Sequence, residues 1–512
     1  MTTLQPTPPA AAPPASPAHP VDQASPAATP PARRTRRWID DWRPEEPDFW
    51  EGGGKQVARR NLGWSIFAEH LGFSVWLIWS VSAAMLGSRF GYSPQQLFFL
   101  VAAPNLVGAL IRIPYTFAVP RFGGRNWTVA SALLLLVPTV LFVVAVQHTG
   151  TPYWVMVLIA ATAGLGGGNF ASSMANINAF YPADKKGAAL GLNAAGGNIG
   201  VAVIQFALPV IVGGAGVFGL VQAAEGGIHL ERAGWVYVAL AVAAALGAYF
   251  FMDNLGTATG STRESAAVLR RPQTWVMSFL YIGTFGSFIG YSAAMPLLIK
   301  VNFSVVDPAS GAVTGGINFV FYAFLGALVG SFTRPFGGWL ADRFGGARVT
   351  LAAFGAMIAA TCAVLWTLSQ VVANPTGDSA VADANSSWFP LFLAFFLCVF
   401  AATGVGNGSA YRMIPTIWRH QHTAGTAAGT AEHRAALLRA TKESSAAVGI
   451  IGAAGAIGGF LIPMMFGAPW IADPLAAVQT AFVLFISYYV LCALVTWSTY
   501  VRRGAPLAAA RA

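Results

Sequence analysis

The chain contains twelve long apolar stretches, and this feature limits its fold more than any other. Each stretch is long enough for the roughly 20 apolar residues that a bilayer-spanning helix needs. Hydrophobic residues make up 55% of the 512 residues and charged residues only 10%, whereas soluble domains are about 25% charged. The sequence therefore predicts an all-α polytopic membrane protein, with helices near 64–88, 97–119, 127–147, 153–180, 188–214, 234–254, 274–299, 316–339, 348–370, 388–412, 446–468 and 477–501.

Basic residues divide unevenly between the two sides of these helices. With the N-terminus placed inside, all but six of the 30 Lys and Arg residues fall in inner loops or in the terminal segments. Three of the six lie in outer loops and three within or at the end of helices: Arg89, Arg232, Lys300, Arg112, Arg334 and Arg412. Short cytoplasmic loops are rich in Lys and Arg. We therefore expect a multi-pass protein of the cell inner (cytoplasmic) membrane with both termini cytoplasmic, and its net charge of +10 does not indicate nucleic-acid binding.

Composition also marks the ends and the middle of the chain. Residues 1–60 begin with a Pro/Ala-rich stretch that includes a basic run at 33–37, so we expect a disordered cytoplasmic tail with a basic anchor. The tail lacks the pattern of a signal peptide. A polar stretch near the middle predicts a linker between two membrane lobes. The expected parts are therefore 1–60 (tail), 61–254 (first lobe), 255–273 (cytoplasmic linker), 274–503 (second lobe) and 504–512 (cytoplasmic tail).

The two halves of the chain repeat each other. Arg112 and the run Arg121–Gly124 recur 222 residues later as Arg334 and Arg343–Gly346. The pattern Gly-x-Gly-Asn at 166–169 recurs at 404–407. Glycines of the fifth predicted helix, among them Gly197, recur 258 residues later in the eleventh, where Gly455 is the counterpart. Six helices repeated in the same sense predict two pseudo-symmetric lobes with a substrate site between them.

Two arginines stand out because they lie inside predicted helices. Arg112 and Arg334 are each about eight residues from an inner turn, which is about 12 Å deep. Such a residue costs at least about 2.5 kcal/mol on insertion scales and indicates function. Glu69 is the one carboxylate well inside a predicted helix, and it cannot neutralise both. Because a guanidinium is planar and permanently charged, the pair favours a small, flat, monovalent anion as substrate. The glycine-rich stretch 164–200 predicts a wall with few side chains beside it.

Other chemistry finds little support in the sequence. The three cysteines fall in apolar stretches without a CxxC pair or a Cys/His cluster, so we predict no metal site and no cofactor. No nucleophile–base pair indicates an enzyme. A sensor would need a folded soluble output domain, which the polar regions do not offer.

The chain from about Asn61 to Arg503 resembles the nitrate/nitrite porters of the major facilitator superfamily, the NarK-like proteins. The resemblance is carried by long motifs: ALIRIPYTFAVPRFGGRNWT at 109–128, GGGNFASSMANINAFYP at 166–182, KGAALGLNAAGGNIG at 186–200, TFGSFIGYSAAM at 284–295, GGWLADRFGGARVT at 337–350 and AAVGIIGAAGAIGGFLIP at 446–463. It implies the major facilitator fold and transport by alternating access, with nitrate and nitrite as the substrates.

The resemblance also implies roles for single residues. The substrate-binding arginines of the family correspond to Arg112 and Arg334, its signature asparagine to Asn198, its substrate-site tyrosine to Tyr291 and its stacking phenylalanine to Phe170. Gly197 and Gly455 fall in the two glycine signatures. A second family phenylalanine, one turn after the tyrosine, is Met295 here. Asp342 and Arg343 match the cytoplasmic lock motif, whose counterpart in the first half keeps the basic residues but lacks the acid.

The family includes nitrate/nitrite exchangers and proton-linked nitrate importers, so the coupling stays open. Proton symport needs a group within the membrane that binds H⁺, and Glu69 and His70 are the candidates. Alternatively, Glu69 pairs structurally and His70 bonds locally. Because exchanger-type members of the family tend to have apolar residues at these positions, we favour proton-coupled nitrate import, with exchange or transport of another small anion as alternatives. We expect a monomer in the lipid bilayer, with nitrate, nitrite and protons as its partners.

Overall fold

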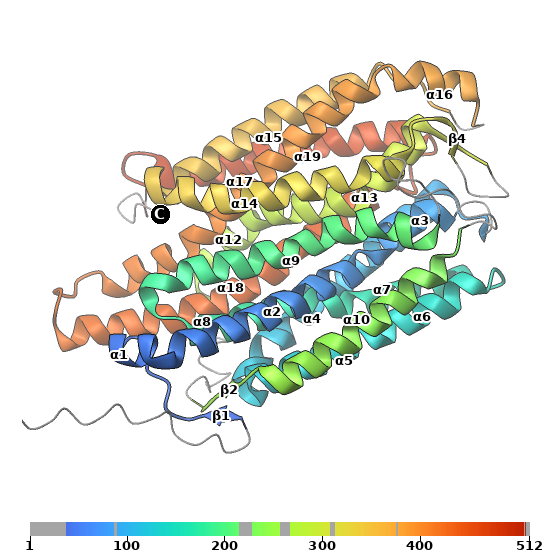
Figure 1. Cartoon of the computed structure of the whole chain (residues 1–512). Coiled ribbons are helices and arrows are strands. Elements are labelled where there is room, and N and C mark those ends of the chain that lie inside the picture. The colour runs from blue at the N-terminus through green and yellow to red at the C-terminus, as the bar shows by residue number, and fades with distance from the viewer. Residues whose placement is uncertain are drawn as a thin grey trace, which may run out of the picture.

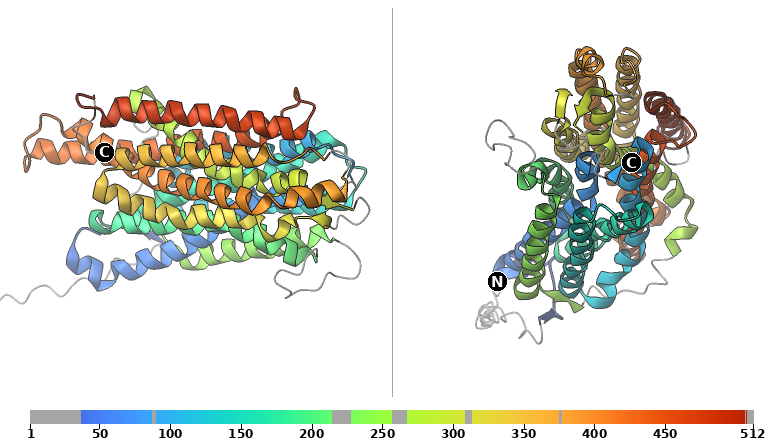
Figure 2. Two further views of the ribbon diagram at one scale, coloured as in Figure 1. Left: turned by 90° about the horizontal axis from the view of Figure 1, so that it is seen from above. Right: turned by 90° about the vertical axis from the view of Figure 1, so that its right-hand side faces the viewer.

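The computed structural model describes residues 37–86, 90–213, 228–256, 267–307, 313–374, 377–505 and 507. Within these residues, twelve helical spans are long and apolar enough to cross a membrane, which confirms the predicted number. The helices run side by side, and seen end-on they form two groups (Figures 1 and 2). The terminal face is the end of the bundle that carries residues 37–54 and 497–505. The distal face is the opposite end, where β3 (Ser304–Val306) and β4 (Val313–Gly316) form a hairpin.

The first lobe contains the six spans before the predicted linker. Several of its spans are built from two helices joined by a short irregular turn. In chain order the helices are α2 (Lys55–Trp76), α3 (Ile78–Leu86), α4 (Pro94–Phe122), α5 (Gly124–Leu134), α6 (Leu136–Gln147), α7 (Tyr153–Thr162), α8 (Asn169–Phe180), α9 (Ala183–Val212) and α10 (Leu230–Phe251). A 3₁₀ turn, Ala163–Gly168, joins α7 to α8.

The second lobe repeats this plan with six spans. Its first span is interrupted by a π-helical turn, Ile282–Gly286, and short 3₁₀ turns at Ala267–Arg270 and Phe319–Phe321 precede two of its helices. The helices are α12 (Pro272–Tyr281), α13 (Ser287–Phe303), α14 (Ala323–Phe344), α15 (Gly346–Leu368), α16 (Ser379–Ser386), α17 (Phe389–Thr423), α18 (Ala431–Phe466) and α19 (Pro474–Thr496), which ends in a π-helical turn, Trp497–Val501. Helices α4 and α18 pack along each other across the lobe interface, as do α9 and α14.

Glycines allow close helix approach at the centre of the first lobe. A Cβ atom on Gly166 would overlap the backbone carbonyl of Gly72 in α2, and one on Gly167 would press on Gly108 and on the Trp76 ring. Small residues at such crossings let the backbones approach one another. The glycine-rich stretch therefore packs α2, α4 and the Ala163–Gly168 turn tightly against one another.

The polar stretch between the predicted helices 388–412 and 446–468 is largely helical. Helix α17 continues to Thr423 and α18 already begins at Ala431, so both extend beyond their apolar parts. The extension of α18 is capped by Thr430, whose hydroxyl accepts the backbone N–H of His433, and is tied down by a two-bond ion pair between Arg271 and Glu443. Hydropathy does not detect such polar helices.

The predicted tail also differs in part from the structure. Residues 1–36 lie outside the described residues, as do most of the linker (257–266) and of the C-terminal tail (506 and 508–512). Residues 37–54, in contrast, form an ordered segment that we call the N-terminal strap. It contains β1 (Trp38–Ile39), α1 (Pro47–Phe49) and a π-helical turn, Trp50–Gly54. Disorder is therefore not what the structure shows for 37–60.

Aromatic residues hold the strap on the terminal face of the first lobe. Strand β1 pairs in parallel with β2 (Asn254–Leu255), which follows α10. The Trp42 indole N–H donates to the carbonyl of Phe180 at 3.2 Å, and Trp50 packs edge-on against Tyr181. The strap thereby joins the end of α10 to the turn between α8 and α9.

We expect Trp42→Ala to destabilise the protein by about 3–5 kcal/mol, the usual cost of truncating a buried tryptophan. Trp42 is 7% exposed and packs against Phe49 and Phe180. Thermal unfolding of the detergent-purified protein should show a clearly lowered Tm. Trp235→Ala is the control because Trp235 lies on the outside of α10 and is 55% exposed. Equal melting of Trp42→Ala and wild type would show that the strap does not stabilise the fold.

Candidate functional site

Arg112 lies in α4, ten residues before the helix ends at Phe122. Its guanidinium is completely buried. The Nε atom donates to the carbonyl of Gly167 at 2.9 Å, and Nη1 donates to the carbonyl of Gly452 in α18 at 3.0 Å. The third nitrogen, Nη2, is buried and has no hydrogen-bond partner among the described residues. Arg112 therefore joins the two lobes and keeps one donor nitrogen unused.

Arg334 occupies the corresponding place in the second lobe, ten residues before α14 ends at Phe344. It is 5% exposed, and its Nη2 donates to the hydroxyl of Tyr281 at 3.4 Å. Its Nη1 is buried without a hydrogen-bond partner in the described part of the chain. Each lobe thus contributes one guanidinium with an unused donor.

Phe170, in α8, lies between the two arginines. Its ring centroid is 4.9 Å from the Arg112 guanidinium carbon and 5.4 Å from that of Arg334. Phe285 lies 4.9 Å from Arg112, and Tyr411 lies 5.6 Å from Arg334. Cation–π attraction contributes about 0.5–2 kcal/mol per contact. These rings stabilise the two buried charges without neutralising them.

Tyr281 stands where the sequence interpretation had expected Tyr291. Tyr291 is buried in an aromatic cluster with Phe396 and Phe482, and its hydroxyl shares a 2.6 Å hydrogen bond with that of Tyr489. No hydrogen bond or cation–π contact joins Tyr291 to either arginine in the described part of the chain. Tyr281 stacks on Phe285, which is one turn later. The structure therefore places a tyrosine–phenylalanine pair at the arginines, ten residues before Tyr291 and Met295.

Counting depth along the span would have found Tyr281. It lies nine residues from the start of α12 at Pro272, or about 14 Å, and Arg334 lies about 15 Å from the same face. Tyr291 is nineteen residues from Pro272, or about 28 Å. Sequence reasoning also missed Tyr411 and Trp76, whose ring lies 5.1 Å from Arg112.

The signature asparagine and the two glycines lie in the long helices at the lobe interface. Asn198, in α9, is fully buried, and neither its amide nitrogen nor its amide oxygen has a hydrogen-bond partner among the described residues. A Cβ atom on Gly197 would overlap the carboxylate of Glu69, and one on Gly455 would overlap the Tyr281 ring. Both glycines therefore abut candidate site residues.

Glu69 and His70 bind different groups of α9. The Glu69 carboxylate is fully buried, and its Oε2 accepts the amide of Asn193 at 2.6 Å. Its Oε1 has no hydrogen-bond partner among the described residues. The His70 Nδ1 lies 3.1 Å from the carbonyl of Gly196. Glu69 is one turn before Phe73, whose ring contacts both Arg112 and Phe170.

The two residues of the predicted lock make separate contacts on the terminal face. Asp342 forms an ion pair with Arg412 of α17. Arg343 lies over the Trp339 ring at 5.1 Å. Within the described residues, no group of three or more His, Cys, Asp or Glu side chains could hold a metal ion.

Comparisons with known proteins agree with this architecture. Residues 70–438 match the model of the Major Facilitator Superfamily. The chain is 38% identical to the nitrate/nitrite transporter NarU of Salmonella typhimurium, over 91% of this chain and 97% of the relative. It is 36% identical to the probable nitrate/nitrite antiporter NarK2 of Thermus thermophilus, over 77% of this chain and 86% of that one.

Among solved structures, a D-xylose–proton symporter aligns with a TM-score of 0.58. The two share 13% sequence identity, and the alignment covers 86% of this chain and 97% of the symporter. At that identity the likeness shows the fold alone. The family match and the two closely similar relatives go further, and this chain belongs to the NarK-like nitrate/nitrite porters of the Major Facilitator Superfamily.

Proposed function

We propose that this chain carries nitrate and nitrite across the membrane by alternating access, with the anion held between Arg112 and Arg334. The observation that carries the proposal is the pair of buried guanidinium nitrogens without partners, one from each lobe, beside a single phenylalanine ring. Charge-assisted hydrogen bonds to an oxyanion are roughly twice as strong as neutral ones. An anion that takes both donors would hold the lobes together. Relatives named as nitrate/nitrite transporters support this substrate.

The sidedness follows from charge. Among the described residues, the terminal face carries most of the basic side chains, for example Arg121, Arg125 and Lys185. By the positive-inside rule we infer that this face is cytoplasmic and that the distal face is outside. Asp342 and Arg412 would then form the lock at the cytoplasmic end of the second lobe.

We further propose that nitrate import is coupled to protons through Glu69. With Glu69 ionised, the two arginines leave the empty carrier with a buried charge of +1. Binding one nitrate and one proton together restores the same +1, so the two forms that must reorient in symport are equally costly to bury. If Glu69 is always protonated, the empty carrier has a charge of +2 and resists reorientation, which describes an exchanger. Exchange is therefore the alternative, and whether Glu69 releases its proton distinguishes symport from exchange.

Transport of another small anion is a weaker alternative. A carboxylate substrate would need an apolar pocket beside the arginines for its carbon chain. The residues around Arg112 and Arg334 are aromatic and tightly packed, which favours a small planar ion.

Arg112→Lys and Arg334→Lys should each raise the Kd for nitrate at least about tenfold. Lysine keeps the charge but loses the forked geometry, and a hydrogen bond to a charged group is worth about 1.5–3 kcal/mol. Calorimetry on the purified variants measures the effect, with the exposed Arg232→Lys as control. Near-wild-type affinity in both variants would remove these arginines from the site.

Replacing Tyr281 and Tyr291 by phenylalanine, one at a time, tests which of the two tyrosines belongs to the anion site. Tyr281→Phe removes the hydroxyl that accepts from Arg334, so we expect nitrate affinity to fall severalfold. Tyr291→Phe removes only the bond to Tyr489 and should lower Tm while leaving affinity unchanged. A nitrate titration and a melting curve on each variant suffice. If Tyr291→Phe weakens nitrate binding and Tyr281→Phe does not, Tyr291 is the tyrosine of the site.

Glu69→Gln should abolish the response of nitrate uptake to a pH gradient while nitrate/nitrite counterflow continues. Glutamine imitates the protonated acid and cannot release the proton. Uptake into proteoliposomes after an imposed pH step, beside counterflow at equal pH, measures both activities. His70→Ala should shift the pH optimum without abolishing transport. If Glu69→Gln still concentrates nitrate after the step, the proton is carried elsewhere. If the wild type ignores the step, the protein is an exchanger.

A further inference from the structure

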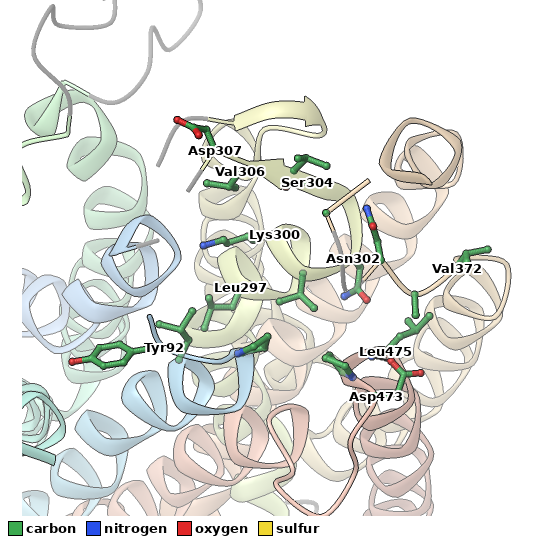
Figure 3. Close-up of a pocket in the computed structure, with 18 of the residues that line it drawn as sticks. Tyr92, Leu297, Lys300, Asn302, Ser304, Val306, Asp307, Val372, Asp473 and Leu475 are labelled. Atoms are coloured by element: carbon green, nitrogen blue, oxygen red, sulfur yellow. Dashed lines mark hydrogen bonds between the residues drawn. The ribbon is translucent and has the colours of Figure 1, made fainter. Parts of the chain in front are cut away.

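A mostly apolar pocket with a few polar side chains lies at the distal end of the lobe interface, away from the central arginines. Its volume is about 360 Å³. Tyr92, Pro94 and Leu97 line it from the first lobe, and Leu297, Lys300 and Asn302 line it from the second. Figure 3 shows the Lys300 side chain extending from its helix in the middle of this pocket. The pocket thus lies between segments of the two lobes that must move apart if the lobes open on the distal side.

Lys300 ties the two lobes together through a neutral group. Its ammonium donates a 2.8 Å hydrogen bond to the carbonyl of Ala84. Ala84 lies in the last turn of α3, which ends at Leu86. Carbonyls in a last turn lack intrahelical partners and carry the negative end of the helix dipole. The contact therefore suits a cation, but it leaves the full charge of Lys300 uncompensated.

Carboxylates near the pocket do not pair with Lys300. Within the described residues no ion pair includes its ammonium group. Asp473 lines the pocket, but its carboxylate caps α19 by accepting the backbone N–H of Leu475 at 3.0 Å. Asp307 lies at the rim, and Figure 3 shows it turned away from Lys300. A half-buried positive charge thus faces the pocket.

A second hydrogen bond joins the same helix to the first lobe deeper in the interface. The Gln205 amide, fully buried in α9, donates to the carbonyl of Ser292 in α13 at 2.6 Å. Helix α13 is therefore held at two levels, by Gln205 inside and by Lys300 at the distal end. The outer of the two ties is the charged one.

We propose that Lys300 is a relay site for the transported monovalent oxyanion at the distal mouth of the pathway. In the closed arrangement its ammonium holds the Ala84 carbonyl. When an anion enters the pocket, the ammonium exchanges this carbonyl for the anion, which releases the tie between α13 and α3. Lysine suits this role because it is a point charge on a flexible stem, whereas the central arginines are rigid forks. The inference rests on the proposed function, since it takes nitrate as the anion.

Two substitutions separate an anion relay from a simple latch. Lys300→Gln removes the charge but keeps a donor for the Ala84 carbonyl, and Lys300→Met removes both. A relay predicts that both variants raise the KM for nitrate at the distal face by roughly tenfold, the low end of electrostatic effects on association. Both should also lose the salt dependence of that KM. Lys300→Arg keeps the charge and should therefore keep the salt dependence of that KM, although its rigid fork makes it a poorer relay than lysine.

The measurement is initial nitrate uptake into right-side-out membrane vesicles at low and high ionic strength. Arg232→Gln is the control because it removes the same charge from an exposed site in the first turn of α10, also on the distal side. Calorimetric nitrate affinity of each detergent-purified variant reports on the central site and should stay within twofold of wild type.

Two outcomes would overturn the relay. If Lys300→Gln keeps the wild-type KM and salt dependence while Lys300→Met does not, Lys300 is only a latch. If Arg232→Gln raises KM as much as Lys300→Gln does, the effect is that of general surface charge. A wild-type protein that takes up no nitrate would instead refute the proposed function itself.

Discussion

Two permanent positive charges buried between the lobes determine much of what surrounds them. Moving an ion out of water costs several kcal/mol even after the protein relaxes. Backbone carbonyls at Gly167 and Gly452 and the rings of Phe170, Phe285 and Tyr411 offset part of this cost. Rings and dipoles, however, cannot cancel the repulsion between two like charges beside one phenylalanine. An anion can, and we therefore propose the substrate as the missing partner of the two arginines.

The two carbonyls that accept hydrogen bonds from Arg112 come from different lobes, so the buried charge is coupled to the relative position of the lobes. Gly167 belongs to the first lobe and Gly452 to the second, so the lobes cannot separate here without breaking a bond to a buried charge. Glycines at the helix crossings bring the backbones near enough for these carbonyls to reach the arginine. The same close packing places Gly197 against Glu69 and Gly455 against Tyr281. The proposed anion and proton sites thus both depend on positions where a side chain would not fit.

The two lobes secure their terminal faces by different means. In the second lobe, Asp342 at the end of α14 pairs with Arg412 of α17. In the first lobe the position 222 residues earlier is Pro120, which cannot form such a pair. There the N-terminal strap supplies contacts instead, because Trp38 and Asn254 close around Gly123, a glycine with a φ of +83°. The first lobe thus lacks the acidic residue of the Asp342–Arg412 ion pair and has the N-terminal strap in its place.

Sequence reasoning reached the features that repeat or that follow from hydropathy. Apolar length predicted the twelve spans, and the 222-residue repeat identified Arg112 and Arg334 as equivalent. Tyr281 was missed because motif matching placed the tyrosine at Tyr291, without a count of depth along the helix. The ordered structure of residues 37–54 was missed because the Pro/Ala-rich composition upstream dominated the prediction. Trp42 and Trp50, which lie in this segment, are both buried. Tertiary contacts determine whether such a segment is ordered, and composition alone does not reveal those contacts.

The most direct test of the central claim is an experimental structure of the protein with nitrate bound. We expect the anion beside the Phe170 ring, within hydrogen-bond distance of Nη2 of Arg112 and Nη1 of Arg334, the two nitrogens that lack partners here. Density for nitrate at that position would support the account. Nitrate bound elsewhere, with both guanidinium groups paired to protein atoms alone, would contradict it.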